Sequence, residues 1–156
     1  MITGIINFKI NKNNNETKYD KEALNKVLDK QEEIITSLSK YVNDQLIEAT
    51  TLIFLYEGKI DTSNAFERID TIKGIHDYTK IKTLAMIYLT KEEFKKVEEI
   101  NDITIKISEF LPDTVESKLD KKKVENIKSL RDELVSSSDN LECIIYNKCR
   151  NILNLE

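Results

Sequence analysis

Residues that interrupt helices are scarce in this sequence, which has 3 glycines and 1 proline among 156 residues. Glycine supplies the positive φ angles of tight turns and of phosphate-binding loops, and proline restricts the backbone and breaks helices. A chain with so little of either is poorly equipped for β-hairpins or a glycine-rich nucleotide site. The composition therefore favours an all-α protein, and the length is that of one domain with a sizeable core.

Metal-ligating and nucleophilic side chains are equally few. His76 is the single histidine, so a site that needs two imidazoles is excluded. Cys143 and Cys149 lie six residues apart in a segment with helical periodicity, which puts their Cα atoms beyond the ~7 Å that a disulfide spans. This spacing also differs from that of structural zinc sites, and Glu-x-x-His is absent. We expect free thiols, no metal, no cofactor and no catalytic residue; a pair of His76 with a cysteine is the alternative.

Long apolar runs and strongly basic segments are missing as well. The longest apolar runs, 52–56 and 84–89, are far shorter than the ~18 residues of a membrane span. No basic segment followed by an apolar one begins the sequence, as a secretion signal would. The formal net charge is −4. We therefore expect a cytoplasmic protein with no membrane partner, and nucleic acid is a disfavoured partner because duplex binding needs concentrated positive charge.

The densest positive run is the one feature that would suit nucleic acid. It consists of Lys118, Lys121, Lys122, Lys123 and Lys128. Interleaved acidic residues cancel much of the field of these lysines beyond a Debye length. A solvated helix start is therefore the favoured interpretation, and a phosphate-binding surface is the alternative. The alternative requires the run to share one face with Lys80, Lys82 or Lys95.

What the sequence does contain is an apolar stripe with strict 4-3 spacing over almost forty residues. Its positions are Leu24, Leu28, Gln31, Ile35, Leu38, Val42, Gln45, Ala49, Leu52 and Tyr56. Such spacing predicts a helix that packs lengthwise against others. A helix over 20–57, started by Asp20 and stopped by Gly58, would measure about 57 Å, more than the ~40 Å across a compact domain of this size. The bundle is therefore elongated, or this helix breaks between Ser39 and Asp44.

Capping signals divide the middle of the chain into shorter helices. Ser63 with Glu67 is expected to open a second helix. Thr90 with Glu93 is the clearest capping box, and it opens a helix that Pro112 must end. The spacing of apolar residues predicts one further helix between these two.

The C-terminal part has helical periodicity that a polar stretch interrupts at 136–140. Asp139 with Glu142 forms another plausible capping box there. We therefore favour two helices, about 116–135 and 140–153, over one continuous helix.

The N-terminal 1–19 is expected to be an arm followed by a polar linker, since 2–10 alternates apolar and polar residues and could form a short strand. The alternation over 103–107 makes that segment its candidate pairing partner, with a helix as the favoured interpretation. Residues 20–156 would then form a single helical domain, an elongated bundle of four to six helices with a long heptad-patterned helix near its N-terminus.

The apolar face of the long helix is wider than one partner helix covers, because Val27, Ile34 and Tyr41 flank the stripe. Gln31 and Gln45 resemble the polar positions that set register in coiled coils, with solvent exposure at the bundle's edge as the alternative. These features favour a non-catalytic module that binds another protein, its own copy included, as a regulator, inhibitor or assembly subunit. Abundant Ile, Asn and Lys suggest an AT-rich genome, which would suit a viral or mobile-element factor acting on a host protein.

Overall fold

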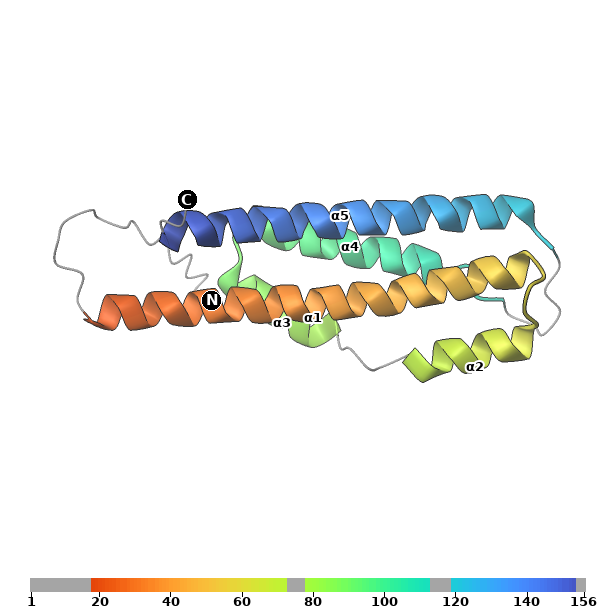
Figure 1. The fold of residues 1–156 in the computed structure, drawn as a ribbon, viewed down its shortest axis with the longest axis horizontal. Coiled ribbons are helices and arrows are strands. Elements are labelled where there is room, and N and C mark those ends of the chain that lie inside the picture. Colours follow the sequence, from red (N-terminus) through yellow and green to blue (C-terminus); the bar gives the residue numbers. More distant parts are fainter. Residues whose placement is uncertain (1–17, 73–77, 113–118, 154–156) are drawn as a thin grey trace.

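The structure is a computed structural model that describes residues 18–72, 78–112 and 119–153. These ranges form helices without a strand: α1 (Lys18–Tyr56), α2 (Thr62–Ile72), α3 (Tyr78–Tyr88), α4 (Lys91–Ser108) and α5 (Lys121–Leu153). The helices pack as an elongated bundle (Figure 1), which confirms the predicted all-α fold. The proposed strand at 2–10 lies outside the described residues.

α1 is one uninterrupted helix of 39 residues, about 58 Å long. Its buried side chains follow the predicted seam through the region where a break was the alternative, with Leu38 1% and Val42 5% exposed. A break between Ser39 and Asp44 would turn part of this face to water. Continuity along α1 therefore keeps a single apolar surface available to the other helices.

Gly58 ends α1 as predicted. Its φ of +71° is a left-handed conformation that favours glycine. The Gly58 N–H donates to the Leu55 carbonyl at 3.0 Å, and the Lys59 N–H donates to the Phe54 carbonyl at 2.8 Å. These two bonds form a Schellman motif, which satisfies carbonyls that the end of a helix would otherwise leave free.

α5 is a single helix of 33 residues, so the two-helix expectation is wrong. Leu134, Ser138, Leu141 and Ile145 are each at most 4% exposed and recur at spacings of four and three, which is the pattern of one continuous face. Serine and asparagine have low helix propensity, but the cost is a fraction of a kcal/mol per residue. Burying the leucines on both sides of 136–140 outweighs it.

The start of α2 also differs from the expectation. Asp61, and not Ser63, caps it, because the Asp61 Oδ1 accepts the Asn64 N–H at 2.8 Å. Ser63 and Glu67 are four residues apart, whereas a capping box needs a spacing of three. The Ser63 prediction was therefore wrong.

α4 begins with the predicted capping box: Thr90 Oγ1 accepts the Glu93 N–H, and the Glu93 carboxylate accepts the Thr90 N–H at 2.7 Å. The helix continues through 103–107, so the strand alternative for that segment is wrong. Ile103 and Ile107, one helical turn apart, both face the core, at 4% and 0% exposure.

Three helices, α1, α4 and α5, contact one another along the bundle, with α1 and α5 antiparallel (Figure 1). α3 packs against α1 and α4. Among the described helices, α2 packs against α1 alone, and it adds Ala65 and Ile69 to the core from outside the α1–α4–α5 arrangement. This leaves one flank of the C-terminal half of α1 with only α2 beside it.

The continuity of α5 can be tested by enlarging Ser138. Ser138→Leu should lower the free energy of unfolding by about 1–3 kcal/mol, because the site is 4% exposed and a larger side chain there must displace packed neighbours. The exposed Ser136→Leu should change it by less than about 0.5 kcal/mol. Urea unfolding followed by circular dichroism measures both variants, and equal effects would contradict a continuous helix with this face buried.

Candidate functional site

The described lysines of the positive run do not form one free surface. Lys118 lies outside the described residues, and Lys121 and Lys122 are exposed at the start of α5. Lys123 Nζ lies 4.7 Å from the ring centroid of Tyr56. Lys128 Nζ pairs with the Glu57 carboxylate at 3.0 Å. Two of these lysines are therefore bound to the C-terminal end of α1.

The lysines that would have to join them lie elsewhere. Lys80 pairs with Glu33 at 3.1 Å and Lys82 with Glu98 at 3.3 Å. Glu33 lies on α1 and Glu57 directly follows its last residue, so the two are about 36 Å apart along the helix axis. The lysines on α3 are therefore far from the α5 lysines, and the two groups do not converge.

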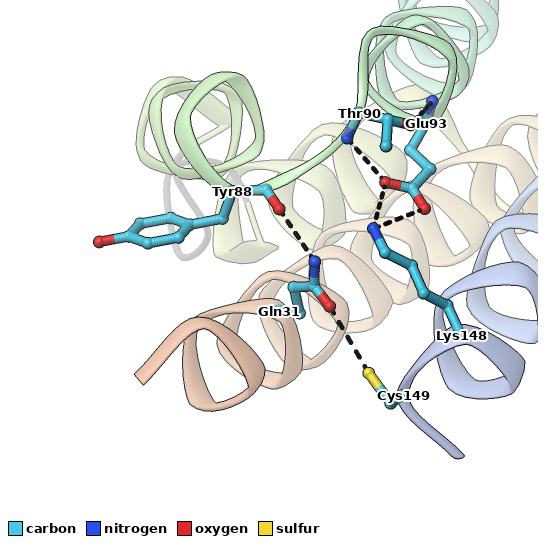
Figure 2. Close-up of polar contacts among 6 residues, drawn as sticks. All are labelled: Gln31, Tyr88, Thr90, Glu93, Lys148 and Cys149. Atoms are coloured by element: carbon cyan, nitrogen blue, oxygen red, sulfur yellow. Dashed lines mark hydrogen bonds and ion pairs between the residues drawn. The ribbon is translucent and has the colours of Figure 1, made fainter. Parts of the chain in front are cut away.

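Gln31 is a buried bridge between three parts of the fold (Figure 2). Its side chain is 2% exposed. The Gln31 Nε2 donates to the Tyr88 carbonyl at 2.9 Å, and its Oε1 accepts the Cys149 thiol at 3.5 Å. Both ends of the amide are thus satisfied, which links α1 to the end of α3 and to α5. Gln45, the other seam glutamine, is half-buried.

The two cysteines are free and differ in environment. Cys143 is exposed, and its sulfur accepts the Asn147 side-chain amide at 3.4 Å. Cys149 is partly buried beside Gln31, and burial raises the pKa of its thiol above the ordinary value. A raised pKa lowers the thiolate fraction near neutral pH, so Cys149 is a weaker nucleophile than an ordinary cysteine.

Glu93 has a second role that the sequence did not reveal. Besides closing the capping box, its buried carboxylate accepts Lys148 Nζ at 3.1 and 3.2 Å (Figure 2). Lys148 comes from the C-terminal end of α5, 55 residues away in the chain. Only the antiparallel packing of α4 and α5 brings the pair together, so no local pattern could have indicated it.

A tyrosine pair lies between α1, α3 and α4. The Tyr41 hydroxyl is 3.0 Å from Asn101 Oδ1 and 2.8 Å from Thr104 Oγ1, and the Tyr41 and Tyr78 ring centroids are 5.6 Å apart. Loss of solvation, followed by the charge of Glu98, raises the pKa of Tyr78 to about 12. A phenol with this pKa stays protonated near pH 7, so Tyr78 is a poor general base there.

The described residues contain no group of three metal-ligating side chains, and none of their helices is long and apolar enough to cross a membrane. Every fully buried side-chain nitrogen or oxygen in 18–72, 78–112 and 119–153 has a hydrogen-bond partner. His76 lies outside these ranges. Some of the bundle's polar side chains connect helices, as Gln31 and Lys148 do, and others bond within their own helix.

An open apolar groove lies between α1 and α2. It has a volume of about 420 Å³. One flank of α1 and one flank of α2 line it: Leu46, Ile47, Thr50, Thr51, Phe54, Arg68 and Thr71. Ile47 and Phe54 lie off the predicted seam, and their seven-residue spacing is the signal that could have indicated a second apolar face on α1.

The hydroxyls in the groove are already engaged with their own helices. Thr50 and Thr51 donate to the carbonyls of Leu46 and Ile47, each at 2.8 Å. Thr71 donates to the Glu67 carbonyl at 2.7 Å. The groove therefore presents mostly methyl groups and carbon atoms to an occupant.

Comparison with known proteins provides no parallel for this site: no protein-family model matches the chain, and no curated protein or solved structure is significantly similar to it.

The contact between Glu93 and Lys148 should contribute to stability. Lys148→Met should lower the free energy of unfolding by about 1–3 kcal/mol, because it leaves a buried carboxylate without its charged partner. Lys95→Met removes the exposed ion pair with Glu99 and should change stability by less than about 0.5 kcal/mol. Urea unfolding compares the two, and an equal loss would show that Glu93 does not depend on Lys148.

The two thiols should differ in reactivity. In the single-thiol variants Cys149→Ser and Cys143→Ser, Ellman's reagent at pH 8 should modify the remaining Cys143 several times faster than the remaining Cys149. Because burial raises the pKa of Cys149, its rate should keep rising at higher pH than that of an ordinary thiol. Equal rates and pH profiles would contradict the partial burial of Cys149 beside Gln31.

Proposed function

We propose that this protein is a non-catalytic module that binds another protein, and that the groove between α1 and α2 is its contact surface. The observation behind this proposal is the groove itself, an apolar surface outside the core that holds Ile47 at 41% exposure. An exposed hollow lined by aliphatic and aromatic side chains gains free energy when a partner covers it. Regulator, inhibitor and assembly subunit are the roles compatible with such binding.

The polar side chains support the same proposal. Gln31, Cys149, Glu93 and Lys148 bond to one another or to backbone across helix boundaries (Figure 2), and the groove's threonines bond to their own helix. Catalysis needs a nucleophile, acid or base that faces a substrate. Side chains already committed to holding helices together are poor candidates for that role.

The lysine run gives little support to the alternative function, nucleic-acid binding. Lys123 and Lys128 are engaged with Tyr56 and Glu57, which leaves Lys121 and Lys122 as the described members of the run without an ion pair to another described residue. Two adjacent lysines neutralise few phosphates, and affinity for nucleic acid grows with the number neutralised.

Site-specific photo-crosslinking in cells that naturally express the protein tests this proposal. Benzoylphenylalanine in place of Ile47 should give a discrete adduct with one partner protein. The same residue in place of Ile105, which is 51% exposed on α4, should not give that adduct. Identical adducts at both positions, or none at Ile47, would show that the groove is not a protein-binding surface.

A further inference from the structure

The shape of the groove indicates what class of partner fits it. From Leu46 to Phe54 it extends about 12 Å along α1. Apolar residues at i, i+3, i+4 and i+7 of an amphipathic helix span about 10.5 Å, which matches this length. Sites for small ligands usually bury most of the ligand. Here Ile47 remains 41% exposed, so a small molecule would stay largely in water, whereas a helix would cover the residue.

The charge of the groove indicates a second property of the partner. Arg68 is the charged residue among the lining side chains. In the part of the chain that the structure describes, no carboxylate forms a salt bridge with Arg68. The acidic residues nearest to it on α2, Glu67 and Asp70, are turned about 100° and 200° away around the helix. A guanidinium beside an apolar groove favours an occupant that brings a carboxylate.

We propose that the groove between α1 and α2 binds an amphipathic helix of a partner protein whose apolar residues fill the groove and whose flanking acidic residue pairs with Arg68. This inference rests on the proposed function and specifies its partner. The net charge of −4 opposes an acidic partner at long range. At about 0.15 M salt the Debye length is about 8 Å, so that repulsion is screened while a direct contact with Arg68 is largely retained.

Two designed 18-residue peptides probe this inference. Both have leucines at i, i+3, i+4 and i+7; one carries glutamates on both sides of the leucine stripe, and its twin carries lysines there. Fluorescence anisotropy at 0.15 M salt should show that the protein binds the glutamate peptide about fivefold tighter than the lysine peptide. Arg68→Glu should reverse this preference. Arg150→Glu, an exposed change near Gln31 and roughly 22 Å along α1 from the groove, should not affect it.

Further variants define where the peptides bind. Ile47→Asp should abolish binding of both peptides, since it places a carboxylate in the apolar groove, and circular dichroism should show that the variant is folded because Ile47 is outside the core. Unchanged binding by Ile47→Asp would place the peptides elsewhere and overturn the inference. Equal affinity of the two peptides, or no effect of Arg68→Glu, would also overturn it.

The remaining outcomes separate this inference from the proposed function. A partner that crosslinks at Ile47 while neither peptide binds would support a protein-binding groove and refute a helical occupant. Sodium decanoate that binds in an Arg68-dependent way, with neither peptide bound, would assign the groove to a fatty anion instead. Peptide binding with the predicted charge preference and a crosslinked partner at Ile47 would support both.

Discussion

The structure depends on removing one long apolar face of α1 from water. Because buried side chains recur on that face from Gln31 to Tyr56, its partners must cover about 38 Å of the helix, which no single short helix can do. α5, with 33 residues, covers most of it from one side, and α3 and α4 follow one another along the other. The elongated shape is therefore a consequence of α1 not breaking, and the burial of this face is the main favourable term.

Apolar burial alone would allow the helices to slide by a turn, and specific polar contacts between helices oppose this. The Ser39 hydroxyl bonds to Glu142 of α5, and the Ser108 hydroxyl donates to Glu48 of α1 at 2.9 Å. Gln31, buried with both ends of its amide bonded, adds a contact between α1 and α5. A shift of one turn would separate the buried Gln31 and Glu48 from these partners, which costs more than the bonds themselves contribute.

The described helices differ in how many neighbouring helices hold them, and this difference bears on the proposed function. On the proposed function, recognition comes from the outer surface of the bundle. Of the described helices, α2 is the one that contacts α1 alone, against which it buries Ala65 and Ile69. Its position creates the groove with Ile47 and Arg68 on opposite helices. A helix held by one neighbour also opens at lower cost than a helix with several, and on the proposed function this would let the groove adapt to a partner.

Local patterns in the sequence were sufficient for the all-α fold, the long first helix, its end at Gly58 and the Thr90–Glu93 cap, because each follows from contacts within a few residues. They gave a wrong prediction at 136–140. The polar stretch there suggested a break, but burial of Ser138 between leucines keeps the helix continuous. Tertiary structure alone decided that Lys148 meets Glu93 and that Arg68 lies beside the outer face of α1. These residues are far apart in the chain, and only the packing of whole helices determines which of them meet.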